Sequence, residues 1–309
     1  MFLLALKNVL ITLLYILPGF LLGKAKKASA DHLSSLSSVL IYICSPCMIV
    51  SSLLALDATA DLLLEMGLFF LVTLALQVLF MLLLFLLLRR RFADAGPRIL
   101  TIGAVMGNVG FFGMPIIRML FPEHPEMAAF SCMYCVSMNI LIFTVGVFCL
   151  TEKKEYMSLR PALLNPTVLS FGAGLVLLLS GAGKVMPAEL LSAVDLLGRM
   201  TAPLCMMILG VRLSAVHLLS LFRRPVVYLT VAMKLLVYPL FCYGICLLFP
   251  LPDTFRAAIL VLSSVPCASV ILNMAEIHHS GQELAANCVL LSTLLCFLTI
   301  PLLTLLLPV

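Results

Sequence analysis

Apolar residues fall in ten segments along this 309-residue chain, separated by short stretches that carry most of the charges. A helix that crosses a bilayer needs about 20 predominantly apolar residues, and only helices and closed barrels satisfy their backbone polar groups within lipid. The pattern therefore predicts an all-α membrane protein. We expect ten transmembrane helices over residues 6–24, 33–55, 62–88, 98–120, 127–150, 163–181, 190–211, 225–249, 255–277 and 283–307.

The second half of the chain repeats the first at an offset of 157–158 positions. Matched identities include Asn8 and Asn165, Lys27 and Lys184, Pro46 and Pro203, Thr73 and Thr230, Ala75 and Ala232, and Arg98 and Arg256. Each half holds five predicted spans, and an odd number inserts the second copy upside down. We therefore predict two inverted five-helix repeats, over 1–150 and 151–309. Such repeats are typical of secondary transporters, whose substrate sites lie between the copies near mid-membrane.

Composition agrees with a chain that lies almost entirely within a bilayer. Hydrophobic residues make up 63% of it, charged residues only 11%, and the mean hydropathy is +1.21. The net charge of +5 is then a matter of membrane topology and not of nucleic-acid binding. We find no phosphate-binding loop and no zinc-protease motif, and we expect no cofactor and no metal. Ala28-Ser29-Ala30 imitates a signal-peptide cleavage site, but the positive charges follow the apolar run instead of preceding it, so we expect a retained first span.

The basic residues predict the orientation of the chain. Thirteen lie in the connections after spans 1, 3, 5 and 7, namely Lys24, Lys26, Lys27, Arg89, Arg90, Arg91, Arg98, Lys153, Lys154, Arg160, Arg212, Arg223 and Arg224. The opposite side carries four: Lys7, Arg118, Lys184 and Arg256. Because cytoplasmic loops are enriched in Lys and Arg, we predict a multi-pass protein of the cell membrane with both termini outside.

Two predicted spans contain residues that do not suit a continuous helix. Span 98–120 holds Gly103, the run Gly107-Asn108-Val109-Gly110, Gly113 and Pro115, and span 255–277 holds the run 263–269 with Pro266 at its centre. Gly costs about 1 kcal/mol and Pro about 3 kcal/mol relative to Ala within a helix. We predict that both spans are broken at mid-membrane and cross each other there, with their half-helix N-termini facing one cavity. The alternative is a tightly packed, kinked helix.

Polar side chains at the same depth extend this candidate site. Gln77 is matched by Lys234 at an offset of 157, and Asn139 lies twelve residues into its span. A lysine within the membrane usually faces a partner or a cavity, so Lys234 is our candidate for the positive charge of an anion site. Interhelical hydrogen bonding is the equal alternative for Gln77 and Asn139. The candidate substrate-binding residues are Gln77, Gly107, Asn108, Val109, Gly110, Pro115, Asn139, Lys234, Ser264 and Pro266.

Other motifs have simpler explanations. Asp195 and Arg199 have the i,i+4 spacing of a helical ion pair. Gly19 and Gly23 form a Gly-x-x-x-Gly motif that favours close helix packing. The Cys-x-x-Cys pairs at 44–47 and 132–135 lie in apolar spans without a nearby histidine, so they do not predict a metal site.

The segment 107–115, Gly-Asn-Val-Gly-Phe-Phe-Gly-Met-Pro, resembles the GN-x-G-(F/Y)-x-G-x-P segment of auxin efflux carrier family permeases. Leu164-Asn165-Pro166-Thr167 is similar to the Asn-Pro that opens that family's second repeat. The resemblance covers essentially the whole chain. The chain has no long loop between spans 5 and 6, so it is most similar to the short prokaryotic members.

The resemblance implies a bile-acid/sodium-symporter-like fold. Spans 1, 2, 6 and 7 would form a scaffold, often dimeric, and spans 3–5 and 8–10 a transport domain that moves as an elevator. It also implies that Asn108 and Pro266 line the substrate site and that malate or malonate are among the candidate substrates. The carboxylate–lysine pair of some plant members has no clear match in span 62–88, where Gln77 is the central polar group.

Three hypotheses for the function follow. The first is a secondary carrier of small organic anions that works as a uniporter or is coupled to protons. The second is a sodium-coupled symporter of the bile-acid type, with carbonyls at the crossing holding the ion. The third, an intramembrane enzyme, would need an acid, base or nucleophile cluster at one depth, and the sequence has none.

The orientation can be tested by labelling an engineered cysteine. Tyr156→Cys, in a background without the native cysteines, should react with a membrane-impermeant thiol reagent only after the cytoplasmic side is exposed. Labelling from outside intact cells would reverse the orientation.

Overall fold

The chain folds almost entirely into helices in a computed structural model that describes residues 2–151, 154–215 and 224–307. Two residues counted above as cytoplasmic, Lys153 and Arg223, lie outside this range. The first half contains α1 (Phe2–Leu14), α2 (Ile16–Lys24), α3 (Ala30–Val39), η1 (Leu40–Cys44), α4 (Ser45–Leu54), α5 (Ala60–Leu88), η2 (Arg89–Arg91), α6 (Ala95–Gly103), η3 (Val109–Gly113), α7 (Met114–Leu120), α8 (Glu126–Leu141), η4 (Ile142–Gly146) and α9 (Val147–Thr151).

The described residues of the second half are also mostly helical. It contains η5 (Lys154–Tyr156), α10 (Leu159–Leu163), α11 (Pro166–Leu179), η6 (Ala182–Lys184), α12 (Ala188–Arg199), α13 (Thr201–Ala215), α14 (Pro225–Ala232), η8 (Met233–Val237), α15 (Tyr238–Cys246), α16 (Asp253–Ser264), α17 (Ser269–Ile277), α18 (Gln282–Leu303) and η9 (Thr304–Leu306). In the described part of the chain, β-pairing is limited to one isolated antiparallel bridge between Gly107 and Cys267.

Seven helices of the described residues are long and apolar enough to cross a membrane, which makes this an integral membrane protein. The seven helices are Phe2–Lys24, Leu33–Leu54, Ala60–Arg91, Glu126–Thr151, Ala188–Ala215, Pro225–Cys246 and Gln282–Leu306. Each of them runs through two or more of the consecutive elements given above.

The other three predicted spans contain shorter helices. Residues 98–120 are divided between α6 and the continuous η3–α7 segment, and residues 255–277 are divided between α16 and α17. The third, α11, has 14 residues. A nine-residue helix such as α6 or α17 is about 14 Å long, roughly half the apolar thickness of a bilayer. The ten-span, inverted-repeat arrangement therefore stays a prediction.

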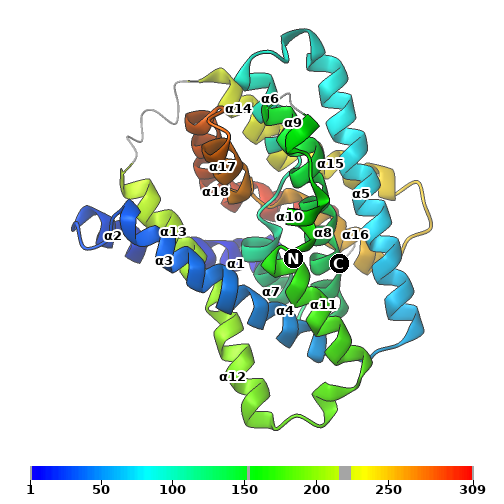
Figure 1. Ribbon diagram of the computed structural model, residues 1–309. Helices are drawn as coiled ribbons and strands as arrows, with labels where there is room; N and C mark the ends of the chain where they lie inside the picture. The colour runs from blue at the N-terminus through cyan, green and yellow to red at the C-terminus, as the bar shows by residue number, and fades with distance from the viewer. Residues whose placement is uncertain (1, 152–153, 216–223, 308–309) are drawn as a thin grey trace.

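The buried centre of the molecule lies around α8 and α16. Thirteen of the sixteen residues of α8 are buried, against nine of the twenty-nine in α5, which runs along one edge of the molecule in Figure 1. Phe69 of α5 stacks on Phe130 of α8 with ring centroids 4.7 Å apart, and Phe255 of α16 meets Phe69 edge-on at 4.8 Å. These rings hold the outer helix α5 against the centre.

Close packing between α2 and α13 joins the two halves at the opposite edge (Figure 1). Gly19 lies against the backbone of Met207, and Gly210 lies against the backbone of Ile16. A Cβ atom at either glycine would overlap these backbone atoms, and one at Gly23 would overlap the side chain of Ser214. The predicted packing role of the Gly19–Gly23 motif is confirmed.

Gly19→Val should therefore destabilise the protein. Overfilling a tight contact costs about 1–3 kcal/mol, so the thermal unfolding midpoint in detergent should fall. Gly67→Ala is the matched control, because a Cβ at Gly67 would meet no atom within 4 Å and Ala favours a helix by up to about 1 kcal/mol. Equal midpoints for the Gly19 variant and the wild type would contradict the packing argument.

Candidate functional site

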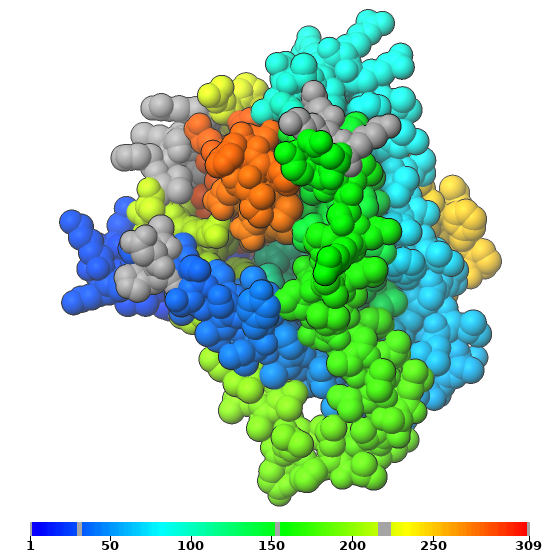
Figure 2. Space-filling model, viewed as in Figure 1, coloured from blue at the N-terminus to red at the C-terminus, as the bar shows by residue number. Residues whose placement is uncertain are grey.

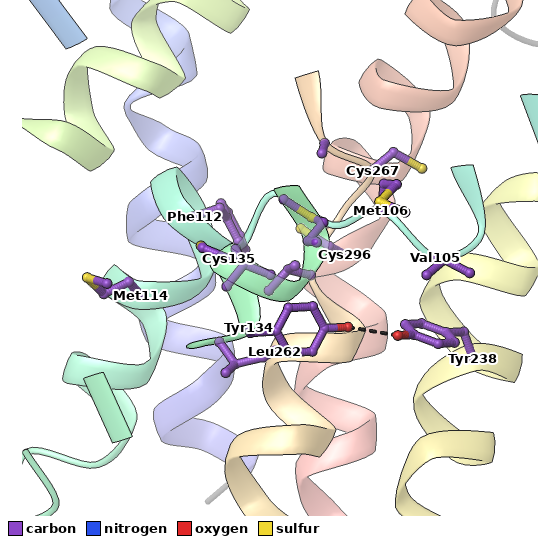
Figure 3. Close-up of a cluster of buried hydrophobic side chains, with 14 of the residues drawn as sticks. Val105, Met106, Phe112, Met114, Tyr134, Cys135, Tyr238, Leu262, Cys267 and Cys296 are labelled. Atoms are coloured by element: carbon purple, nitrogen blue, oxygen red, sulfur yellow. Dashed lines mark hydrogen bonds between the residues drawn. The ribbon is translucent and has the colours of Figure 1, made fainter. Parts of the chain in front are cut away.

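The two helix interruptions meet and satisfy each other's backbone. One lies between α6 and η3, the other between α16 and α17. The amide of Asn108 donates to the carbonyl of Pro266 at 2.8 Å, and the amide of Ala268 donates to the carbonyl of Met106 at 3.0 Å. Met106 and Cys267 lie together there in Figure 3. Because unpaired backbone groups are costly away from water, this pairing allows both helices to break in the protein interior.

This crossing, residues 104–108 with 265–268, is also held by α18. The hydroxyl of Ser292 accepts from the amide of Cys267 at 3.0 Å, and the thiol of Cys267 donates to the carbonyl of Gly103 at 3.3 Å. The bridge pairs Gly107 with Cys267, an offset of 160, whereas the sequence repeat matches Asn108 with Pro266. Each residue of the bridge is thus the immediate neighbour of a sequence-matched residue: Gly107 precedes Asn108, and Cys267 follows Pro266.

Lys234 contacts the C-terminal ends of two interrupted helices. Its Nζ donates to the carbonyl of Ser263 at 2.9 Å, in the last turn of α16, and to that of Val105 at 3.2 Å, just after α6. Its side chain is fully buried, and Nζ lies 4.9 Å from the ring centroid of Tyr238. A helix C-terminus carries a partial negative charge, so the ammonium is stabilised by two such ends and by the ring.

Gly107 leaves the space that Lys234 fills. A Cβ atom there would lie 2.9 Å from Nζ of Lys234 and 2.8 Å from Cγ2 of Val265. Both distances are shorter than ordinary contacts between such atoms. Any side chain at position 107 would therefore displace Lys234 or Val265.

Two adjoining cavities reach the side of the crossing where η3 and α17 begin, opposite Lys234. The larger, about 800 Å³, lies between α3, α13, α17 and α18. The smaller, about 70 Å³, continues inward and is lined by Asn108, Cys205, Ser269, Asn273 and Arg212, among others. Figure 2 shows the hollow between α3, α13 and α17, with the chain around η3 at its base. Asn108 is 7% exposed and its amide Nδ2 lies 4.0 Å from Sγ of Cys205.

Arg212 is the basic residue that lines both cavities. It is partly buried and forms no hydrogen bond or ion pair with any residue in the described ranges. The acidic residues of the larger cavity, Glu276 and Glu283, are exposed. The guanidinium of Arg212 is therefore available to an anion in the cavity, and its planar donors suit a carboxylate.

The structure brings some of the predicted site residues together and separates others. Gly107, Asn108, Val109, Gly110, Ser264, Pro266 and Lys234 lie in or beside the crossing, although the hydroxyl of Ser264 donates back to Val261 at 2.8 Å. Of these, Asn108 lines the smaller of the two cavities described above. Lys234 lies on the other side of the crossing, among carbonyls.

The remaining predicted residues lie elsewhere. Gln77 is fully buried and donates from Nε2 to the hydroxyl of Ser137 at 3.0 Å, which is an interhelical contact between α5 and α8. Asn139 is 6% exposed within α8. Pro115 lines a different cavity of about 500 Å³, together with Arg118 and Arg199.

Sequence reasoning missed three residues of the cavity wall: Arg212, Ser269 and Asn273. The charge pattern predicts that Arg212 lies in a cytoplasmic connection, whereas α13 continues through it to Ala215. Ser269 and Asn273 are four residues apart at the start of α17, so they share one helix face. That spacing of polar residues within an apolar span was the available signal.

Comparisons with known proteins agree with these features. The family model described as "Membrane transport protein" matches residues 4–304. The chain is 23% identical over 301 residues to an uncharacterized transporter of Methanothermobacter thermautotrophicus, covering 96% of each chain. It is 24% identical over 300 residues to an uncharacterized transporter of Methanocaldococcus jannaschii, covering 95% of this chain and 96% of the relative. The chain therefore belongs to the membrane transport protein family of auxin efflux carriers and is a membrane transporter.

Proposed function

We propose that this transporter is a secondary carrier of small organic anions, with dicarboxylates such as malate and malonate as candidate substrates. The observation that carries the proposal is the inner cavity, where the guanidinium of Arg212 and the amide of Asn108 line one small space. Since Arg212 pairs with no carboxylate in the described part of the chain, it can bind a substrate carboxylate through two parallel hydrogen bonds. The neutral side chain of Asn108 adds one donor group and one acceptor that can position the substrate.

Helix ends add to the positive character of this cavity. α17 begins at Ser269, which lines both cavities, and η3 begins directly after Asn108. The N-terminus of a helix carries a partial positive charge, which favours an anion there. The two partial charges and Arg212 together support an anionic substrate over a neutral or cationic one.

The location of the cavities supports an elevator mechanism. They lie between α3 and α13, which belong to the predicted scaffold, and α17 and α18, which belong to the predicted transport domain. In this proposal the chain consists of ten spans in two inverted repeats, with both termini outside, and the scaffold is the surface for a homodimer. The larger cavity then opens to the cytoplasm, because α3 follows the basic segment of Lys24, Lys26 and Lys27.

Arg212→Gln should weaken binding of malonate or malate by about tenfold to a hundredfold, because a hydrogen-bonded contact to a charged group contributes about 1.5–3 kcal/mol. Asn108→Ala should cost less, about twofold to tenfold, as expected for a neutral hydrogen bond. Both effects can be measured by titration calorimetry on the purified protein and by uptake into proteoliposomes.

Arg160→Gln is the matched control, because Arg160 is exposed on α10 and lines neither cavity. It should bind the anions like the wild type. Wild-type affinity in the Arg212 variant would exclude Arg212 as the substrate's counter-charge. A wild-type protein that binds and transports neutral analogues as well as the dicarboxylates would exclude an anion carrier.

An ion pair across the predicted domain boundary offers a test of the movement. Asp195 of α12 accepts from Arg199 of the same helix at 2.6 Å and from Arg118 of α7 at 3.2 Å. An elevator movement of α7 along the scaffold would break the second contact. Asp195→Asn should change the ratio of inward to outward states by up to about fivefold, since a partly exposed pair contributes at most about 1 kcal/mol.

The readout is the labelling rate of Thr12→Cys, which lines the cavity beside Arg118, in a background without the native cysteines. Asp253→Asn removes a comparable pair with Arg256, three residues away in the same helix, and should leave the rate unchanged. An unchanged rate in the Asp195 variant as well would show that this pair does not restrain the movement.

A further inference from the structure

The crossing contains a place where negative helix ends converge on a single cation. α6 and α16 both end beside Lys234, and the carbonyls of Val105 and Ser263 point their oxygens at its Nζ. In carriers built from broken helices, half-helix C-termini and unwound carbonyls coordinate the coupling cation. Here the same kind of oxygen ligand is bound to an ammonium that belongs to the chain.

The space around this ammonium is closed. The side chain of Lys234 has no exposed surface, and Gly107, Val265 and the ring of Tyr238 surround its end. Even one added carbon at Gly107 would lie 2.9 Å from Nζ. A sodium ion could reach the two carbonyls only if the lysine side chain withdrew.

The lysine also cannot exchange with solution as a transported ion does. It is attached to η8, between α14 and α15, and its stem runs through the packed interior next to Tyr238. Tyr238 is itself held by a 2.9 Å hydrogen bond from one hydroxyl to that of Tyr134, drawn in Figure 3. The tether and these contacts hold the amine of Lys234 at the crossing.

We propose that Lys234 is a built-in cation that takes the place of an exchangeable sodium ion at the crossing, so that transport by this protein does not depend on sodium. The inference rests on the proposed function only in treating the chain as a secondary carrier. It assigns Lys234 a positioning role: the ammonium fixes the two helix ends, and the substrate binds on the other side of the crossing.

The first experiment uses the wild-type protein. Uptake of radiolabelled malonate into proteoliposomes is measured with sodium or with N-methylglucamine outside, at a membrane voltage fixed by potassium and valinomycin. We expect rates that agree within twofold. Uptake that requires sodium at constant voltage would overturn the inference. Absence of malonate and malate uptake in either salt would instead count against the proposed function, and the second experiment then decides the inference alone.

The second experiment measures thermal unfolding of Lys234→Ala and Lys234→Met in choline, sodium or ethylammonium chloride. Both variants should be less stable than the wild type. The alanine variant leaves an empty space beside two carbonyls, so sodium or ethylammonium should raise its midpoint by about 2–4 °C relative to choline. The methionine side chain fills that space without a charge, so neither ion should raise its midpoint, and neither should raise that of the wild type.

A folded alanine variant that gains nothing from either cation would overturn the assignment of a cation site. A wild-type protein stabilised by sodium over choline would also overturn it. Lys184→Ala, which removes an exposed lysine paired with Asp57 on the surface, controls for general effects of losing a lysine and should respond to the salts like the wild type. If the alanine variant does not fold, the two wild-type measurements still decide the question.

Discussion

The constraint on which this structure depends is the cost of interrupting two helices inside a membrane protein. Each interruption frees amides and carbonyls that cannot bind water there. The crossing meets this cost in two ways: backbone pairs between Asn108 and Pro266 and between Ala268 and Met106, and the ammonium of Lys234 on the carbonyls of Val105 and Ser263. The backbone pairs and the lysine contacts both lie at the crossing, because α16, α17 and η8 of the second half meet the first half there.

The crossing has two electrically different sides as a result. The C-terminal, negative ends of the interrupted helices are covered by a buried lysine and closed to solvent. The N-terminal, positive ends are left facing the cavities, where Arg212 adds a full charge. Because the fixed cation already balances the negative ends, the open side is free to attract an anion. The proposed substrate class and the proposed independence from sodium are thus consequences of one arrangement.

Close approach of backbones makes this arrangement possible. Gly107 leaves room for the lysine, Gly103 lies against Thr230, and Gly19 with Gly210 brings α2 onto α13. In lipid there is little hydrophobic driving force between helices, so such close contacts provide much of the association energy. The glycines that weaken the isolated helices therefore stabilise their assembly.

Much of this could be predicted from the chain itself. The length and spacing of apolar segments determined a helical membrane protein, because the bilayer imposes those lengths. Gly107, Asn108 and Pro266 marked both interruptions, since their intrinsic conformational preferences oppose a helix whatever surrounds them. The segment 107–115 also identified the family, which the match over residues 4–304 confirms.

What only the tertiary structure decided is which way each polar side chain faces. Sequence position gives the depth of a residue along a helix but not the neighbour it meets around the axis. Lys234 and Asn108 have similar predicted depths, yet one binds a carbonyl 129 positions away and the other lines a cavity. Arg212 enters the site because α13 extends past the predicted end of its span. Such contacts are fixed by the packing of whole helices, which no local pattern of residues records.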